Sequence, residues 1–332
     1  MNEPETAFVS GGSGFVGRNL IRRLRRQGHA VVALVRTAQA AASVKALGAS
    51  VIEGDLDAVA VLQRGMQHCQ WVFHAAAKVG VQGSAADFHR VNVTGTANML
   101  AAARAASVCC FIHVSTEAVL ANGHPLVNLN ESTPLPARPL PGYPASKARA
   151  EQRVLAANSD ALETVIVRPR LIWGADDTSL LPMLVQAVCS GRFRWIGGGR
   201  YPTATTHVFN VCEALVLAAR HGRPGEVYFV TDGAPVELRA FLTRLLATRG
   251  VRIPDASVPH AVASVAATWG DFMHRTLKLA GPPAISRMAL RLFGGPVTID
   301  DGKARRELGY RPVITRQQGL DALATAEQSG HG

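Results

Sequence analysis

The sequence predicts an α/β fold in which a doubly wound parallel sheet is followed by a smaller, mostly C-terminal lobe. Short apolar segments alternate with amphipathic helical segments over the first half of the chain, as in parallel sheets covered by helices on both faces. A glycine-rich turn joins the first strand to the first helix, and the regular alternation weakens after Gly174. With 332 residues, of which 48% are hydrophobic, the chain is long enough for about two lobes.

The glycine-rich turn, Gly11 to Gly17, lies between a predicted strand at residues 7–9 and an amphipathic helix. Two glycine patterns overlap there, Gly12-x-Gly14-x-x-Gly17 and Gly11-x-x-Gly14-x-x-Gly17. In either pattern the early glycines allow a tight turn, Gly14 lets the backbone approach a pyrophosphate, and Gly17 lets the helix pack on the sheet. The phosphates would bind the N–H groups at the N-terminus of the helix. This context predicts a dinucleotide site in a Rossmann-type sheet rather than an ordinary glycine-rich turn.

The second predicted strand, at residues 31–35, is a near-continuous apolar run that is followed by Arg36. At this position an acidic residue binds the ribose 2′-hydroxyl of NAD, whereas an arginine accommodates the 2′-phosphate of NADP. The sequence therefore predicts NADP(H) as the cofactor in preference to NAD(H). The alternative is that Arg36 is an ordinary surface arginine after a strand.

The strands that follow end in residues suited to contact a cofactor. Asp55, after the third strand, is a candidate acceptor for the adenine amino group, and Leu56 is a candidate to pack on the ring. The fourth strand ends in Ala75 and Ala76, where small side chains let the backbone pass close to a cofactor, and the neighbouring His74 is interpreted as structural. The predicted elements are strands at residues 50–53, 71–77 and 110–114 and a helix at residues 87–106.

The stretch at residues 122–142 is rich in proline and is predicted to be an irregular loop, because residues before proline avoid the helical conformation. It leads into Tyr143-Pro-Ala-Ser-Lys147, from which a helix runs to about Ala157. Further strands are predicted at residues 164–169 and 226–230. The predicted domains are an NADP-binding domain of residues 1–173, to which residues 203–231 return, and a substrate-binding lobe of residues 174–202 and 232–332.

Tyr143 and Lys147 are four residues apart and lie on one face of the predicted helix. Tyr143 is the candidate general acid/base, although the pKa of a free tyrosine is about 10. The ammonium group of Lys147, one turn away, is expected to favour the phenolate and so to permit proton transfer near neutral pH. Lys147 is also expected to bind the nicotinamide ribose, and Thr116 or Ser115, at the carboxyl end of the fifth strand, to hold the substrate oxygen.

The composition argues against several classes of function. The net charge of +11 suggests an anionic partner, but no aromatic residues are interleaved with the basic ones, which argues against nucleic acid. The five cysteines include no C-x-x-C pair, which predicts a reduced protein without a metal site. No stretch approaches the roughly 20 apolar residues of a transmembrane segment, and the N-terminus lacks the apolar run of a signal peptide. We therefore expect a cytoplasmic protein.

Together these motifs resemble those of the extended short-chain dehydrogenases/reductases, over nearly the whole chain and in the expected order. The resemblance implies that Thr116 supplies the catalytic hydroxyl, with Ser115 as the fallback, and that Asn92 helps to organise a proton relay. It selects the Gly11, Gly14 and Gly17 pattern, and it implies a homodimer formed through the helices near residues 88–106 and 143–157. The matching segments are Gly11…Gly14…Gly17, Gly54-Asp55-Leu56, His74-Ala75-Ala76, Asn92-Val93-Thr94-Gly95-Thr96, Ser115-Thr116, Tyr143-Pro-Ala-Ser-Lys147, Arg168-Pro169 and Lys303-Ala304-Arg305…Leu308-Gly309-Tyr310-x-Pro312. The cofactor-binding residues it implies are Gly11, Gly14, Phe15, Val16, Gly17, Arg36, Asp55, Leu56, Ala75, Ala76, Tyr143, Lys147 and Arg168.

Within this superfamily the chain is most similar to the 3β-hydroxysteroid dehydrogenase-like branch. Nucleotide-sugar epimerases and dehydratases carry an Arg-Asp pair at a place where this chain has Thr205 and Thr206, ahead of His207. Without that charged clamp, a small hydrophobic secondary alcohol or ketone is the expected substrate: sterol- or steroid-like, a 3-oxo acid or an aryl ketone. The resemblance thus implies an NAD(P)-dependent oxidoreductase that transfers a hydride.

Two other functions stay open on the same fold. One is a nucleotide-sugar epimerase or dehydratase, and the other is a non-catalytic NADP-sensing protein, although such proteins tend to lose the Tyr–Lys pair. Residues 255–295 also leave alternatives open, because their aliphatic and aromatic residues suit a substrate lid, a membrane-contacting surface or a second small core.

Overall fold

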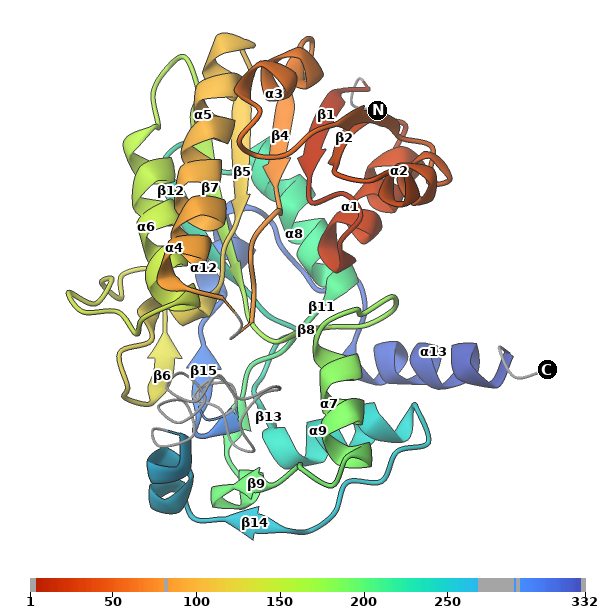
Figure 1. Cartoon of the computed structure of the whole chain (residues 1–332), viewed down its shortest axis with the longest axis vertical. Helices are drawn as coiled ribbons and strands as arrows, with labels where there is room; N and C mark the ends of the chain where they lie inside the picture. Colours follow the sequence, from red (N-terminus) through yellow and green to blue (C-terminus); the bar gives the residue numbers. More distant parts are fainter. Residues whose placement is uncertain (1–3, 81–82, 268–289, 291–292, 330–332) are drawn as a thin grey trace.

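The computed structural model describes residues 4–80, 83–267, 290 and 293–329 of the chain (Figure 1). Its central sheet consists of β1 (Thr6–Ser10), β2 (Ala30–Val35), β3 (Ser50–Glu53), β4 (Trp71–His74), β5 (Cys110–Val114), β7 (Glu163–Pro169) and β12 (Glu226–Val230). These strands lie in the order β12-β7-β5-β4-β1-β2-β3, and every neighbouring pair is parallel. The predicted α/β fold with a doubly wound parallel sheet is therefore confirmed.

Helices cover both faces of this sheet (Figure 1). On one face are α1 (Phe15–Arg26), α2 (Ala38–Lys45) and α8 (Val208–His221), and on the other are α3 (Val59–Met66), α5 (Gly95–Ala105) and α6 (Tyr143–Ala156). Leu20 and Leu215 belong to the first of the two cores that result, and Met66 and Val154 to the second. Burial on both faces explains why the strands are apolar almost throughout.

Several elements have the expected bounds and others differ in detail. The strands β3, β5 and β12 cover the predicted residues, whereas the fourth strand ends at His74, three residues early. The single helix expected at residues 87–106 is divided into α4 (Ala85–Phe88), a π-helical turn (His89–Thr94) and α5. The π-helical turn places Asn92 against α6, where it contributes to the site described below.

The prediction of an irregular loop at residues 122–142 is wrong over β6 (Leu126–Leu129). This strand pairs in parallel with β15 (Val297–Ile299). The backbone N–H of Asn128 also donates to Oγ1 of Thr298, a residue 170 positions later in the chain. A strand that depends on so distant a partner leaves no signal in its local sequence.

The lobe lies beyond the carboxyl ends of the sheet strands and is built from short strands and apolar helices (Figure 1). Leu181 of α7, Phe241 of α9 and Leu320 of α13 share its buried core. Its helices include α7 (Leu180–Cys189), α9 (Leu238–Ala247) and α13 (Arg316–Ser329). A four-stranded sheet has the order β13 (Val236–Glu237), β10 (Pro202–Thr203), β15 and β6. Two pairs complete the lobe, β8 (Ile172–Trp173) with β11 (Thr206–His207) and β9 (Trp195–Ile196) with β14 (Ser257–Val258).

Two segments lie across the proposed domain boundary. The strand β6 precedes residue 173 but belongs to the sheet of the lobe. Conversely, α12 (Gly302–Glu307) contributes Ala304 to the core of the main sheet, together with Leu308 and Tyr310 that follow it. Of residues 255–295, the stretch 268–289 and residues 291–292 lie outside the described residues. No helix in the described ranges is long and apolar enough to cross a bilayer.

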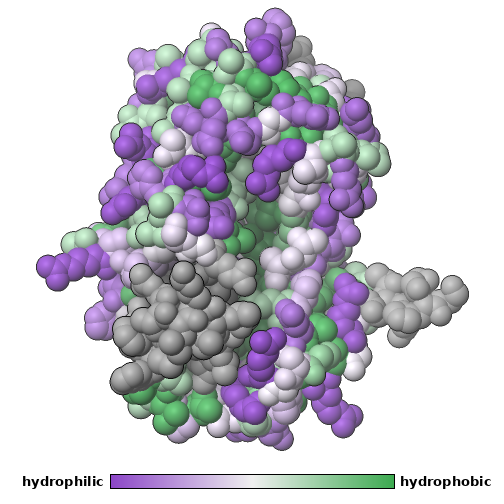
Figure 2. All heavy atoms as spheres, viewed as in Figure 1, coloured by the Kyte–Doolittle hydropathy of each residue, from purple (hydrophilic) through white to green (hydrophobic). Residues whose placement is uncertain are grey.

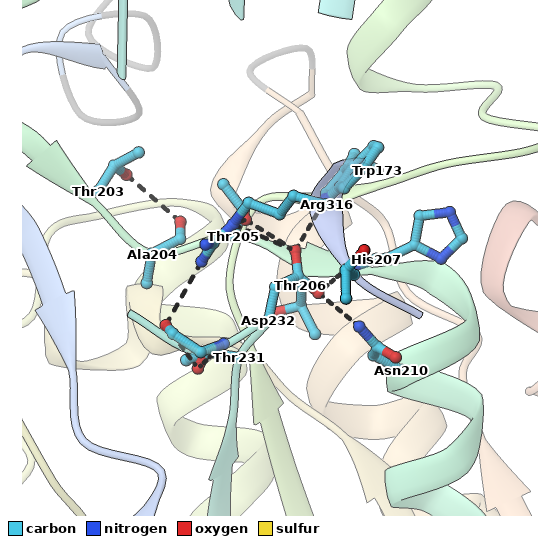
Figure 3. Close-up of polar contacts among 12 residues, drawn as sticks. Trp173, Thr203, Ala204, Thr205, Thr206, His207, Asn210, Thr231, Asp232 and Arg316 are labelled. Atoms are coloured by element: carbon cyan, nitrogen blue, oxygen red, sulfur yellow. Dashed lines mark hydrogen bonds and ion pairs between the residues drawn. The ribbon is translucent and has the colours of Figure 1, made fainter. Parts of the chain in front are cut away.

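The carboxylate of Asp232, just after β12, joins the main sheet to the lobe (Figure 3). It accepts hydrogen bonds from Nε1 of Trp173 at 2.8 Å, from Oγ1 of Thr205 at 2.7 Å and from Nδ2 of Asn210 at 2.7 Å. The backbone N–H of His207 donates to it at 2.6 Å. One buried carboxylate thus binds donors from β8, from the segment before β11, from β11 itself and from α8.

We expect replacement of Asp232 to destabilise the protein strongly, because its side chain is completely buried and four donors would lose their acceptor. The Asp232→Ala variant should lose about 3–5 kcal/mol of unfolding free energy, measured by urea denaturation. The matched control is Asp255→Ala, whose side chain is 94% exposed and pairs with Arg239. That variant should lose less than about 1 kcal/mol, and equal losses in the two variants would contradict the role given to Asp232.

Candidate active site

The turn between β1 and α1 forms a cradle of backbone that side chains would fill. A Cβ atom at Gly11, where φ is +70°, would lie 2.8 Å from the backbone nitrogen of Ala76, and one at Gly17 would lie 2.1 Å from the carbonyl oxygen of Gly11. By contrast, a Cβ at Gly12 would press on the Ala33 side chain, so Gly12 serves packing against β2. Gly11 and Gly17 thus lie against backbone atoms, whereas Gly12 lies against a side chain, which favours the pattern of Gly11, Gly14 and Gly17.

The N-terminus of α1 is open to an anion. Its N-cap, Gly14, provides no side-chain cap, and no acidic residue lies in the first turn, which contains Phe15, Val16 and Gly17. The first N–H groups of a helix have no partner within the helix, and together with the helix dipole they favour negative charge. These residues therefore fit the pyrophosphate of a dinucleotide cofactor.

The residues expected around the adenosine half of the cofactor lie at the carboxyl ends of β2 and β3. Arg36 and Asp55 are both exposed, and Oδ1 of Asp55 accepts a hydrogen bond from the backbone of Asp57 at 2.9 Å. Leu56 is half-buried and packs on Gly95, where a Cβ would lie 2.7 Å from its Cδ1 atom. The structure thus brings these three expected residues to one end of the sheet.

Tyr143 is the first residue of α6, and the Thr116 side chain interacts with its phenol and acts to lower the pKa of that phenol. Thr116 caps a short 3₁₀ turn, η2 (Glu117–Leu120), and accepts a hydrogen bond from the backbone of Ala118 at 3.2 Å. The Thr116 hydroxyl itself donates to Oε2 of Glu117 at 2.8 Å. The hydroxyl of Ser115 is buried and has no hydrogen-bond partner among the described residues. Of the two candidate hydroxyls, Thr116 is the one in contact with Tyr143.

Lys147 is buried on the next turn of α6 and is held by β5. Its Nζ atom donates to the carbonyl oxygen of Val114 at 2.8 Å and contacts Nε2 of His113 at 2.9 Å. Burial lowers the pKa of Lys147 to about 8, against the opposing effect of the Glu151 carboxylate. Burial and the nearby Lys147 hold the pKa of His113 well below its usual range, so His113 is neutral and can accept this hydrogen bond.

Lys147, which is expected to favour the Tyr143 phenolate, is not among the groups that shift the pKa of Tyr143 in this structure. Burial of the phenol raises the pKa of Tyr143 above its usual value, and the Glu117 carboxylate raises it further. The hydrogen bond with Thr116 acts in the opposite direction but is the smaller effect. The Lys147 ammonium is bound to β5. Because its pKa is raised, Tyr143 is a protonated phenol at neutral pH.

Asn92 ties the π-helical turn to the start of α6. Its Nδ2 group donates to Oγ of Ser146 at 2.9 Å and to the carbonyl oxygen of Lys78 at 3.0 Å, and its Oδ1 atom accepts from the backbone of Lys78 at 2.7 Å. Asn92 thereby links α6 to the chain just after Ala75 and Ala76. The expected site residue thus lies beside the helix that carries Tyr143.

Arg168 is buried in β7, and its guanidinium binds Glu151 of α6 through two nitrogen atoms, with Nε at 2.9 Å from Oε1. It also lies over the ring of Phe229, 5.3 Å from the centroid. This arrangement fixes α6 on the sheet. The Arg168 guanidinium, which was expected to contact the cofactor, is bound to side chains of the protein itself. His74 is similarly occupied, since its ring nitrogens contact Ser10 at 2.7 Å and Thr96 at 2.9 Å.

The sequence analysis did not include a buried ion pair next to Thr116. Glu117 and Arg170 are 4% and 2% exposed, and Nη1 of Arg170 binds Oε1 of Glu117. Nε of Arg170 also donates to Oγ1 of Thr203 at 3.3 Å. The sequence did offer a signal for this pair. Glu117 directly follows the predicted site residue Thr116, and Arg170 directly follows the Arg168-Pro169 motif. In the described part of the chain, no cluster of histidine, cysteine and acidic residues suits a metal ion.

The lowered pKa of Lys147 makes a prediction about stability and pH. Between pH 8 and pH 10.5 the folded protein holds Lys147 neutral while the unfolded chain keeps it charged, so unfolding takes up a proton. The unfolding free energy of the wild type, relative to Lys147→Met, should therefore rise with pH in this window by up to about 1.4 kcal/mol per pH unit. Urea denaturation of both proteins from pH 7 to pH 10.5 measures it, and a difference that does not change with pH would contradict the burial effect.

Comparison with known proteins identifies the family. Residues 8–260 match the model of the 3-beta hydroxysteroid dehydrogenase/isomerase family. The chain is 54% identical, over 98% of its length and 97% of the relative, to 4-hydroxy-2-methyl-3-oxo-4-farnesyl-3,4-dihydroquinoline-1-oxide ketoreductase from Stigmatella aurantiaca. It is 34% identical to 2-alkyl-3-oxoalkanoate reductase from Stenotrophomonas maltophilia, over 95% and 97% of the two chains. It is 31% identical to a decarboxylating sterol-4-alpha-carboxylate 3-dehydrogenase from Dictyostelium discoideum, over 96% and 100%.

Solved structures show the same fold. The chain superimposes on the crystal structure of gox2253 with a TM-score of 0.78 and 27% identity, over 99% of both chains. It superimposes on UDP-glucuronic acid 4-epimerase from Bacillus cereus with a TM-score of 0.73 and 18% identity, over 98% of this chain and 100% of the other. The chain belongs to the 3-beta hydroxysteroid dehydrogenase/isomerase family of extended short-chain dehydrogenases/reductases, and it is an NAD(P)-dependent oxidoreductase that acts on hydroxyl and keto groups.

Proposed function

We propose that this oxidoreductase reduces the ketone of a hydrophobic substrate to a secondary alcohol, with NADPH preferred as the hydride donor. The observation that carries the proposal is the protonated phenol of Tyr143 beside Thr116, at the carboxyl end of β5 and at the same edge of the parallel sheet as the glycine turn after β1. In open α/β sheets ligands bind at this edge. A neutral phenol there is suited to donate a proton to a carbonyl oxygen.

The proposed mechanism assigns one role to each polar group. When bound, the reduced nicotinamide supplies a hydride to the carbonyl carbon of the substrate. Tyr143 donates its proton to the carbonyl oxygen, and Thr116 orients the Tyr143 hydroxyl. Lys147, fixed by Val114 and His113, holds positive charge beside the site, and Asn92 fixes the start of α6 through Ser146.

A hydrophobic substrate agrees with the surroundings of this site. Figure 2 shows a hollow in the molecular face between the main sheet and the lobe, with apolar residues along it. The Thr205 and Thr206 hydroxyls, which stand where nucleotide-sugar enzymes carry a charged pair, are bound to Asp232 and to the carbonyl oxygen of Val230. They offer no clamp for a charged substrate. The relative at 54% identity is a ketoreductase of a farnesylated ring system, which supports a ring ketone with an apolar substituent as the substrate class.

The preference for NADPH rests on Arg36. Its side chain is exposed at the carboxyl end of β2 and, within the described part of the chain, forms no ion pair. An exposed guanidinium with no acidic partner is available to a 2′-phosphate, which it can bind through two parallel hydrogen bonds.

The role of Tyr143 predicts a selective loss of turnover. In assays with a panel of ring ketones, 3-oxo acids and steroid ketones, Tyr143→Phe should lower kcat about 10³-fold, because only the proton donor is removed. Its affinity for NADPH, measured by fluorescence titration, should stay within about twofold. The matched control is Tyr228→Phe, which removes a hydroxyl that binds Glu307 and the backbone of Arg223, far from Thr116. Turnover retained by Tyr143→Phe would overturn the mechanism. If the wild type acted only on nucleotide sugars, the proposed class of hydrophobic ketone substrates would be wrong.

The role of Arg36 predicts a change in cofactor preference. The wild type should bind NADPH more tightly than NADH, and Arg36→Ala should weaken NADPH binding at least tenfold while it leaves NADH binding unchanged. Fluorescence titration with both cofactors measures this, with Arg26→Ala, an exposed arginine at the far end of α1, as the matched control. Tighter binding of NADH by the wild type would refute the preference.

A further inference from the structure

His74 lies at the centre of a buried series of hydrogen bonds between the glycine turn after β1 and the π-helical turn before α5. It is the last residue of β4, and it is 1% exposed. Its Nδ1 atom is 2.7 Å from Oγ of Ser10, the last residue of β1, and its Nε2 atom is 2.9 Å from Oγ1 of Thr96 in α5. Ser10 and Thr96 are also almost completely buried, so the three polar side chains bind one another rather than bulk solvent.

The direction of each hydrogen bond follows from the groups at the two ends. The Thr96 hydroxyl donates its single hydrogen to the carbonyl oxygen of Asn92 at 2.7 Å, so Thr96 can only accept from His74. Nε2 of His74 therefore carries a hydrogen. Burial, with a smaller effect of the Lys147 ammonium, lowers the pKa of His74 to about 3. The ring is thus neutral, and its Nδ1 atom accepts the hydrogen of the Ser10 hydroxyl.

The Ser10 end of this series reaches the backbone that lies against the glycine turn. Oγ of Ser10 accepts a hydrogen bond from the backbone N–H of Ala76 at 3.3 Å. The same nitrogen of Ala76 would lie 2.8 Å from a Cβ at Gly11, so the two backbone segments are in close contact. Both Gly11 and Ala76 are expected to line the cofactor site. Through Ser10, His74 therefore holds the end of β4 against the glycine turn.

The Thr96 end of the series reaches the helix that carries Tyr143. The carbonyl oxygen to which Thr96 donates belongs to Asn92, and the Asn92 side chain donates to Oγ of Ser146 at 2.9 Å. The Ser146 hydroxyl in turn donates to the carbonyl oxygen of Tyr143 at 2.7 Å, in the first turn of α6. A shift of Thr96 would therefore be passed on to the backbone that carries the phenol.

We propose that His74 is a positioning residue that joins the two halves of the site, with Nδ1 fixing the cofactor-binding turn through Ser10 and Nε2 fixing the start of α6 through Thr96. The part that concerns α6 rests on the proposed function, because it acts on the same general acid. A histidine that only filled space between strands would need neither ring nitrogen. The proposal therefore requires that the two nitrogens have separable effects.

Two conservative replacements separate the two nitrogens. In His74→Asn the amide lies near the position of Nδ1 and can still accept from Ser10, whereas in His74→Gln it lies near that of Nε2 and can still donate to Thr96. His74→Phe keeps a ring but has neither group. We expect His74→Phe to weaken NADPH binding about fivefold and to lower kcat for ketone reduction about tenfold. His74→Asn should restore mainly the affinity, and His74→Gln mainly kcat.

Loss of two buried hydrogen bonds can prevent the folding of His74→Phe, so each end of the series is also tested alone. Ser10→Ala should weaken NADPH binding about fivefold, measured by fluorescence titration, and should leave kcat within about twofold; Thr96→Val should do the reverse. The matched control is Thr164→Val in β7, which removes a buried hydroxyl that donates to the carbonyl oxygen of Val154 near the amino end of the sheet. The control should change neither quantity by more than about twofold.

The proposal is wrong if Ser10→Ala and Thr96→Val both leave NADPH affinity and kcat unchanged, or if the three replacements of His74 behave alike. Equal changes in Thr164→Val would also contradict it, because they would reduce the effect to a general loss of stability. The affinity for NADPH is measured without a ketone, so the effect of Ser10→Ala tests the role of His74 independently of the reaction. If Tyr143→Phe keeps its turnover, the proposed function fails, and the affinity measurements still decide the role of Nδ1.

Discussion

The geometry of this protein depends on the buried carboxylate of Asp232, which binds segments of the main sheet and of the lobe at once (Figure 3). The proposed site needs both parts, because Tyr143 belongs to a helix on the main sheet whereas the hollow with apolar residues lies between that sheet and the lobe (Figure 2). A surface contact between the two parts would let them move apart easily. A completely buried carboxylate with four donors cannot be separated from them without a large cost in free energy.

Buried polar groups around the site follow one rule: each is bound to a partner that fixes it. Arg168 binds Glu151, Lys147 binds β5, and Arg170 binds Glu117. Such buried, fully paired interactions are electrostatically strong and favour a single arrangement of the groups around the site. Among the described residues, the buried hydroxyl of Ser115 and Nδ1 of His113 are exceptions. Ser115 lies at the end of β5, where the cofactor and the substrate would meet.

The sequence was a good guide to the fold wherever local pattern and tertiary environment agree. The strands β3, β5 and β12 are short apolar runs with turn residues beside them, and Gly11 and Gly17 stand where only glycine fits. It was a poor guide to features made by distant partners. The strand β6 exists because of β15, and the lobe contains strands of two residues that pair with segments far away in the chain. No local periodicity can indicate such pairs.

The same division applies to the site. Tyr143, Lys147 and Thr116 were predicted from motifs, but the electrostatic state of Tyr143 was not, because it depends on burial and on a carboxylate from another element. Glu117 follows Thr116 in the chain, yet nothing in the sequence shows that Arg170, 53 residues later, lies against it. Charge in the site is thus a property of the folded structure rather than of the motif.

Threonine rather than serine at position 116 fits this arrangement. A β-branched side chain has fewer accessible χ1 rotamers than serine, so its hydroxyl is more easily held in one direction. In this structure that direction is set by Glu117 on one side and by the backbone N–H of Ala118 on the other. The extra methyl group therefore reinforces the orientation that the carboxylate imposes. A serine would keep the same hydroxyl but would lose part of the restriction that holds the Thr116 hydroxyl between Glu117 and Ala118.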